Sequence, residues 1–327
     1  MRFNLDKNAL IYGYMLSGAS KGTAIAASDL AEGVSSDECS WLHFDYTHPD
    51  AIEWIEQKSE LEPVVIAALL SEETRPRATL LKSGVLLSLR GVNLTSGSNP
   101  EDMVAIRVWI DEKRIISTRK RPLLSAQDIV ALIDANEGPE TPGEFVATLA
   151  NRLIARMQET IQDTEDKVAE IEEEVLTAES YSLRSEIADL RRQAISLRRY
   201  LAPQREAMLQ LQSEKMVLFS VDDHVKLRET TDHLIRYIED LDSVRDRAAV
   251  TQEELVNRLS EQLNNRMYVL SIVAAIFLPL GFFTGLLGIN VGGIPGAENP
   301  NSFMIFILFL VVVVSLQVWL FKVKRWF

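Results

Sequence analysis

Two small groups of histidine and aspartate residues have side chains that bind transition metals. His43 and Asp45 are two residues apart in a segment with strand character, so both would lie on one face of the strand. Asp222, Asp223 and His224 are consecutive and stand near the start of a long helical segment. Imidazole and carboxylate groups are common zinc ligands, but neither group has zinc-finger spacing. For the first group a structural role is therefore favoured over metal binding. The second group is the better candidate for metal binding, although it could equally cap its helix, because acids stabilise a helix N-terminus.

An asparagine and a glutamate near the C-terminal end have oxygen atoms suited to hydrated cations. Asn290 follows Gly288 and Ile289 directly after a long uncharged segment, and Glu298 is the only ionised residue in the loop 288–302. A single asparagine beyond a helix end often only caps it. In a ring of several copies, its carbonyl oxygens would form a collar that holds a divalent ion through its water shell. A ring of glutamates would attract cations to that collar.

Two uncharged segments flank these residues and have the length of membrane spans. Residues 267–287 and 303–321 contain 21 and 19 residues, and neither segment includes Asp, Glu, His, Lys or Arg. A helix needs about 20 residues to cross the hydrocarbon core, so the sequence predicts a hairpin of two transmembrane helices. A hairpin buried in a soluble core is the alternative, and two such runs make it a poor explanation.

Basic residues precede the first segment of the hairpin and follow the second. They are Arg258, Arg266, Lys322, Lys324 and Arg325. The loop 288–302 between the two segments contains no lysine or arginine. By the positive-inside rule, both termini are predicted to be cytoplasmic and the loop to face outward.

The composition excludes several classes of function. The 327 residues have a formal net charge of −13, whereas nucleic-acid binding needs clustered Lys and Arg, so no nucleic-acid partner is expected. Cys39 is the only cysteine, so no internal disulfide can form and a reducing compartment suits the soluble part. We find neither a nucleophile with a base at useful spacing nor a glycine-rich phosphate loop. Neither an enzyme nor a resident cofactor is therefore expected.

The segment before the membrane hairpin changes character near residue 143. Strands are predicted at 40–46, 85–89, 104–109 and 114–118, and helices at 50–57, 63–70 and 125–135. From Phe145 to Val175 an apolar stripe with steps of three and four predicts one helix. Residues 151–179 contain nine acidic and three basic residues, whereas 180–206 contain six arginines and three acids. These opposite charges favour an antiparallel pair of helices.

The last segment before the membrane predicts one long helix. No proline or glycine interrupts 221–266, so a helix from Val221 would continue through the first span and reach roughly 100 Å. Such a helix needs neighbours, and identical copies could supply them around an axis. One of its faces is small or weakly polar and would line a path through the membrane: Asn264, Met267, Ser271, Leu278, Gly281 and Gly285. The glycines could instead serve close helix packing, and Pro279 is predicted to bend the helix.

These observations predict an α+β membrane protein with six parts. They are an N-terminal cytoplasmic α/β domain (1–143), a cytoplasmic helical stalk (144–266), a pore-lining transmembrane helix (267–287), an outer loop (288–302), a second transmembrane helix (303–321) and a basic cytoplasmic tail (322–327).

The layout of the chain from end to end resembles the CorA superfamily of metal-ion transporters, and the specific motifs lie within residues 197–327. The resemblance depends on Gly288-Ile289-Asn290, where isoleucine replaces the usual methionine, and on the segments 197–201 and 275–280. The Gly-Ile-Asn variant followed by 291–296 is similar to the zinc-transporting ZntB branch.

This resemblance implies a funnel-shaped homopentamer in the bacterial inner membrane, with a periplasmic loop and a central pore. It implies that Asn264, Leu278, Gly281 and Asn290 face the pore, and that the cargo is a divalent cation. In this branch the cargo is Zn²⁺, and proton-coupled uptake is one proposal. The family usually has Met and Thr where this chain has Leu278 and Gly281, so its inner constrictions are not expected to transfer unchanged.

Two other functions fit the same sequence. One is a Mg²⁺, Co²⁺ or Ni²⁺ channel with the same architecture, and the other is a membrane-anchored helical scaffold that conducts nothing. Because neither span contains an ionisable side chain, a coupled proton would have to move through water or outside the membrane.

Overall fold

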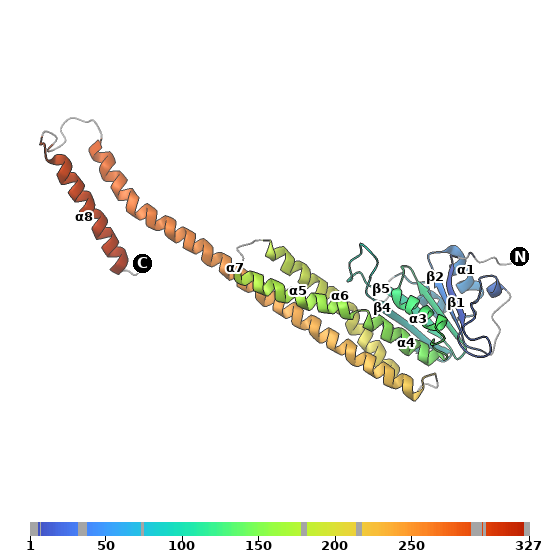
Figure 1. Ribbon diagram of the computed structural model, residues 1–327. Helices are drawn as coiled ribbons and strands as arrows, with labels where there is room; N and C mark the ends of the chain where they lie inside the picture. Colours follow the sequence, from blue (N-terminus) through green and yellow to red (C-terminus); the bar gives the residue numbers. More distant parts are fainter. Residues whose placement is uncertain are drawn as a thin grey trace. The chain divides into compact units, whose positions relative to one another are not determined.

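The computed structural model describes residues 6, 8–31, 38–72, 75–177, 182–213, 218–288, 296 and 299–323. They form two compact units, Met1–Gln252 and Glu253–Phe327. The elements, most of which are labelled in Figure 1, are β1 (Leu10–Met15), η1 (Asp29–Ala31), β2 (Ser40–Asp45), α1 (Pro49–Gln57), α2 (Pro63–Leu69), β3 (Arg77–Leu81), β4 (Gly84–Gly91), β5 (Val104–Ile110), β6 (Arg114–Arg119), α3 (Leu124–Asp134), α4 (Pro142–Ala155), α5 (Gln158–Thr177), α6 (Leu183–Ser213), α7 (Val221–Gly288) and α8 (Ser302–Val323).

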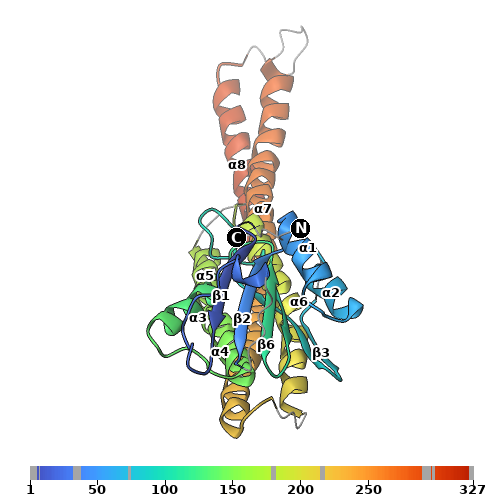
Figure 2. The same cartoon turned by 90° about the vertical axis from the view of Figure 1, so that its right-hand side faces the viewer.

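The first unit contains a six-stranded mixed sheet. The strand order is β1-β2-β6-β5-β4-β3, and only the β2–β6 pair is parallel. Figure 2 shows β1, β2 and β6 side by side. The parallel pair needs a crossover, which α1, α2 and β3 to β5 provide. The four predicted strands and three predicted helices of this region are confirmed within one or two residues at each end, whereas β1 and β3 were not predicted.

Helices cover both faces of the sheet. On one face α1 and α2 bury an apolar core against β2, with the rings of Phe44 and Trp54 stacked at 4.8 Å. On the other face α4 places Phe145 against Trp41, with ring centroids 5.0 Å apart. Successive strand residues point to opposite faces, so Trp41 and Phe44 belong to different layers of the core. The prediction of an N-terminal α/β domain is confirmed.

The single helix predicted from Phe145 to Val175 is wrong, because the chain breaks between α4 and α5. Arg156 ends α4 and makes two hydrogen bonds with Asp128 of α3, from Nε to Oδ2 and from Nη2 to Oδ1, both at 2.6 Å. Met157 is fully buried, so the apolar stripe continues through the break. The apolar pattern therefore could not reveal the boundary between α4 and α5. At this boundary Arg156 contacts α3, and the sequence pattern does not show that contact.

The two helices of opposite charge, α5 and α6, pack against each other as predicted. Both also form ion pairs with α7. Arg247 of α7 donates from Nη2 and Nε to the carboxylate of Glu172 of α5 at 2.5 and 2.9 Å. Arg198 of α6 lies 2.6 Å from Asp242 of α7. These side chains are about a third exposed, and such pairs contribute roughly 0–1 kcal/mol each.

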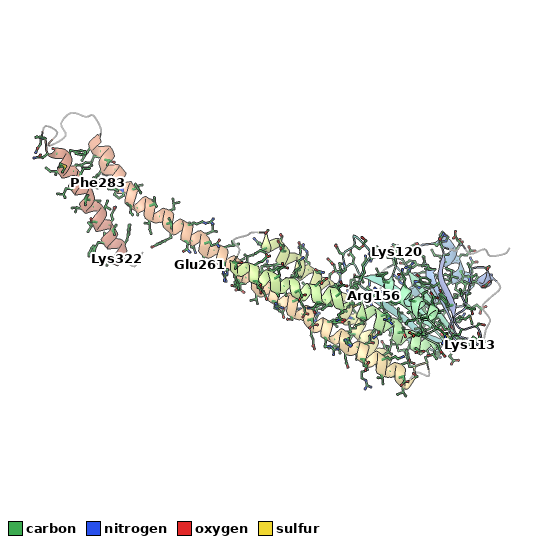
Figure 3. The ribbon with its side chains drawn as sticks, viewed as in Figure 1. Lys113, Lys120, Arg156, Glu261, Phe283 and Lys322 are labelled. Carbon is green, nitrogen blue, oxygen red and sulfur yellow. The ribbon has the colours of Figure 1, made fainter. Side chains whose placement is uncertain are left out.

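The second unit contains the C-terminal part of α7 together with α8. Both helices include a stretch long and apolar enough to cross a membrane, and neither stretch is buried within the protein. This result matches the predicted hairpin of two candidate membrane helices. Phe283 and Lys322 mark opposite ends of the hairpin in Figure 3. The long helix predicted from Val221 is confirmed, since α7 continues without interruption to Gly288.

Candidate functional site

The residues predicted to line a path share one exposed face of α7. They are Asn264, Met267, Ser271, Leu278, Gly281 and Gly285, and all six are exposed in the single chain. Leu278 is 76 % exposed although it lies in the middle of an apolar segment. In a bilayer such a face must meet lipid, water or another protein chain.

The face of α7 that contacts α8 is nearly opposite. The less exposed residues of this part of the helix are Ile272, Ala275, Ile276, Pro279, Leu280 and Phe283. At 3.6 residues per turn, most of them fall across the helix from the exposed set. Ile272 is 9 % exposed, and the ring of Phe283 meets that of Phe309 of α8 edge-on at 5.0 Å. Thus α8 covers one side of α7 and leaves the candidate face uncovered.

Small residues keep the uncovered face open. A Cβ atom added at Gly281, Gly285 or Gly288 would meet nothing within 4 Å. Packing against α8 therefore does not require glycine at these positions. The two remaining reasons for the glycines are room along a path and close approach of a neighbouring copy.

The polar groups on this face are neutral oxygen and nitrogen atoms. The hydroxyl of Ser271 donates to the carbonyl of Met267 at 2.7 Å, which satisfies its proton and leaves its oxygen able to accept. One turn before Met267, the amide of Asn264 is exposed. Such groups can bind the water shell of a cation without fixing the cation itself.

The residues predicted for the outer mouth are only partly within the structure. Gly288 is the last residue of α7, whereas Ile289, Asn290 and Glu298 lie outside the described residues. On the other side of the loop, Asn299 accepts a hydrogen bond from the backbone of Asn301 at 3.0 Å, just before α8 begins.

His43 has a structural role in the sheet. It is fully buried on β2, its Nδ1 lies 2.8 Å from the hydroxyl of Ser117, and its ring stacks on Tyr12. Asp45, the second residue of this predicted group, accepts hydrogen bonds from the backbone and hydroxyl of Thr47 at 3.0 and 2.6 Å. The structure therefore favours the structural alternative over a metal site for this pair.

Burial should make His43 a source of acid sensitivity. Burial, and secondly the charge of Arg119, lower the pKa of His43 to about 3 from its ordinary value of 6.5. Below about pH 6.5 the unfolded chain binds a proton that the folded chain excludes, so stability falls as pH decreases from 6.5 toward 3. We expect His43→Asn to be less stable at neutral pH but to lose about 1.4 kcal/mol less per pH unit in this window.

Unfolding of the full-length protein in detergent, followed between pH 7 and pH 4, measures this slope. His233→Asn, at an exposed position of α7, is the control and should keep the wild-type slope. An unchanged slope in His43→Asn would show that another group excludes the proton.

The second predicted group caps α7. The carboxylate of Asp223 accepts from the backbone N–H and the hydroxyl of Ser220 at 2.9 and 2.8 Å, and the N–H of Asp223 donates back to that hydroxyl at 3.2 Å. His224 packs its ring against Phe219, and Asp222 is exposed in the first turn of α7. These reciprocal hydrogen bonds resemble a capping box. Over the part of the chain that the structure describes, no three His, Cys, Asp or Glu side chains are placed to bind one metal ion.

One polar residue of the hairpin was not identified from the sequence. Gln317 of α8 donates from Nε2 to the carbonyl of Ala275 of α7 at 3.2 Å. A glutamine within an apolar span is a signal that could have been used, because polar side chains there usually join helices.

Comparison with known proteins covers almost the whole chain. A family model described as CorA-like Mg²⁺ transporter protein matches residues 36–325. The divalent cation transporter CmaX of Pseudomonas aeruginosa is 40 % identical over 324 residues, which is 98 % of each chain. The zinc transport protein ZntB of Yersinia enterocolitica is 36 % identical over 322 residues, covering 98 % of this chain and 97 % of ZntB. The solved structure of full-length CmaX superposes with a TM-score of 0.84 at 39 % identity, covering 98 % of this chain and 99 % of CmaX.

Proposed function

This chain belongs to the CorA-like Mg²⁺ transporter family, and we propose that it transports divalent cations across the bacterial inner membrane as a homopentamer. The central path of the pentamer would be lined by the exposed face of α7. Both sequence relatives described above are named as transport proteins, in line with the expectation that the chain is not an enzyme.

The position of α8 is the observation that carries this proposal. Two helices cannot enclose a polar path, so the path must lie between copies. Because α8 covers the side of α7 that holds Ile272 and Phe283, it leaves the side that holds Ser271 and Gly281 free to face an axis. Apart from Met267 and Leu278, the face that would line the path has small or weakly polar side chains.

The arrangement in the membrane follows from the charges near the hairpin. We place 267–287 and 303–321 in the membrane, with 1–266 and 322–327 in the cytoplasm and 288–302 in the periplasm. The cytoplasmic parts of five copies would together form a funnel that leads to the pore. Membrane lipids would contact the apolar surfaces of α7 and α8 that no copy covers.

Zn²⁺ is the proposed cargo, and Asn290 is the proposed outer binding group. The Gly288-Ile289-Asn290 motif and the 36 % identity to ZntB support zinc, whereas CmaX is named only for divalent cations. A collar of amides would hold the ion through its water shell, and a ring of Glu298 would concentrate cations near it. Mg²⁺, Co²⁺ and Ni²⁺ form the alternative set of cargoes for the same path.

Flux into vesicles tests the function and the cargo together. We expect purified full-length protein in liposomes to transport Zn²⁺ faster than protein-free liposomes do. The same preparation should be measured with Mg²⁺, Co²⁺ and Ni²⁺, and with and without an imposed pH gradient. Faster Zn²⁺ uptake along an inward proton gradient would support proton coupling.

Two results would change the proposal. Mg²⁺ flux without Zn²⁺ flux would show that the cargo is Mg²⁺ and would leave the proposed path along α7 unchanged. The absence of flux for all four ions, in protein shown to be assembled, would favour the non-conducting scaffold.

A further inference from the structure

Pro279 leaves one backbone carbonyl of α7 without its helical partner. In an α-helix the N–H of each residue donates to the carbonyl four residues earlier. Proline has no N–H, so the carbonyl of Ala275 lacks this donor. The apolar part of a membrane offers no replacement, and an unpaired carbonyl is costly there.

The side chain of Gln317 on α8 supplies a donor to this same carbonyl. Its Nε2 lies 3.2 Å from the oxygen of Ala275, and the contact is partly buried. The segment 303–321 contains only two polar side chains other than the tryptophan, Ser315 and Gln317. Of these two, Gln317 is the one that meets α7, and it does so where proline has freed a carbonyl.

A second contact has the same antiparallel register. Phe283 of α7 meets Phe309 of α8 edge-on. Moving eight residues back along α7 and eight residues forward along α8 leads from this ring pair to Ala275 and Gln317. The hydrogen bond therefore fits the packing of the whole hairpin.

The amide oxygen of Gln317 supports the view that glutamine is present at this position for the hydrogen bond that its Nε2 donates to Ala275. Within the described segments its Oε1 atom is buried and has no hydrogen-bond partner. An unpaired buried oxygen is unfavourable, and an apolar side chain would avoid it. The benefit of glutamine at this position is therefore the donor that it brings to Ala275.

We propose that Gln317 is a positioning residue that replaces the donor removed by Pro279 and fixes α8 against the interrupted part of α7. The bond ties down α7 at a point where its own ladder is broken, beside the turn that carries the exposed residues Leu278 and Gly281. It thereby holds the path-lining face in place. The effect on flux depends on the proposed transport function, whereas the effect on hairpin stability does not.

A double-mutant cycle between the two positions tests the proposal. The proteins are wild type, Gln317→Leu, Pro279→Ala and the double variant, with Ser315→Leu as a matched control on the exposed side of α8. In wild type, Gln317→Leu should lower the folding equilibrium constant in SDS titration by roughly threefold to tenfold. It should also lower maximal Zn²⁺ flux while leaving the half-saturating concentration unchanged.

The same substitution should have almost no effect in Pro279→Ala, because the N–H of alanine then donates to Ala275. Equal effects of Gln317→Leu in both backgrounds would overturn the proposal, and so would an equal effect of Ser315→Leu. If no variant conducts Zn²⁺, the SDS titration still decides the role of Gln317. If Zn²⁺ flux is intact but the double-mutant cycle shows no coupling between Gln317 and Pro279, the positioning role of Gln317 is refuted, whereas the proposed transport path is not affected.

Discussion

Replacing Gly281 with leucine is expected to reduce Zn²⁺ flux by roughly a hundredfold, which corresponds to a barrier about 3 kcal/mol higher. In one chain the new side chain meets open space, since a Cβ at this position has nothing within 4 Å. The helix itself should gain stability, because leucine favours helix by roughly 0.8 kcal/mol over glycine. In the proposed pentamer, however, five leucines would narrow the path and strip water from the ion. Flux in liposomes, normalised to assembled protein, measures the loss.

Ser315→Leu is the matched control, because it places the same side chain on an exposed position of α8. It should conduct like wild type. If Gly281→Leu assembles normally and conducts at the wild-type rate, then Gly281 does not face the path. If it fails to assemble, the glycine serves close packing between copies, and Gly281→Ala then becomes the variant to measure.

Replacing Asn290 with alanine is the second variant with a large expected effect. Removing a ring of amides would remove several hydrogen bonds to the hydrated ion, and at 0.5–1.5 kcal/mol each the loss in flux should be roughly tenfold or more. The half-saturating Zn²⁺ concentration should rise, because the amides would act on the ion as it enters. Zn²⁺ flux measured over a range of concentrations separates the two changes.

Asn301→Ala is the control for Asn290→Ala, since both replace an asparagine of the outer loop. The backbone carbonyl of Asn301 accepts from the N–H of Ile305 at 3.0 Å, and that bond survives the substitution. Unaltered flux in Asn290→Ala would contradict a collar of amides and would favour a capping role for this residue.

The sequence could predict which residues share a face of α7, because helix periodicity alone decides this; that this face lines a path stays a prediction. Positions such as Ser271, Leu278 and Gly285 recur at steps of seven and must align on any regular helix. Which side of the helix α8 covers depends on the register of the hairpin. That register places Gln317 against Ala275, and no local pattern could reveal it.

The elements missed by sequence reasoning are those whose limits depend on distant residues. Strand β1 contains Gly13, where a Cβ would come within 2.7 Å of the carbonyl oxygen of Ile25. A glycine there weakens the strand pattern, but the close approach of a neighbouring segment requires it. Strand β3 is short and partly exposed at the sheet edge. Such edge strands lack the apolar alternation on which the prediction depended.

Of the two predicted metal groups, only the one at His43 depends on a distant partner. His43 is held by Ser117, a residue 74 positions away along the chain. Proximity in sequence to Asp45 suggested a ligand pair, but His43 contacts Ser117 of the neighbouring strand β6, and Asp45 accepts its hydrogen bonds from Thr47. For Asp223 the sequence allowed either helix capping or metal binding, and the hydrogen bond from the hydroxyl of Ser220 supports capping.

Reactivity of single cysteines along α7 tests the central claim most directly. The native Cys39 is 6 % exposed, and burial raises the pKa of its thiol to about 12, so it should not react with thiol reagents. The reaction of a thiol reagent with a single introduced cysteine can therefore be measured without a contribution from Cys39. In the single chain both Leu278 and Val273 are exposed, at 76 % and 46 %, so only the assembly can distinguish them.

The measurement is the rate at which a positively charged, membrane-impermeant methanethiosulfonate modifies Leu278→Cys and Val273→Cys in lipid. A watery path enclosed by copies of this chain predicts that Leu278→Cys is modified and that Val273→Cys, on the side that meets lipid or protein, is protected. Protection of both cysteines, or equal modification of both, would contradict a path lined by this face of α7.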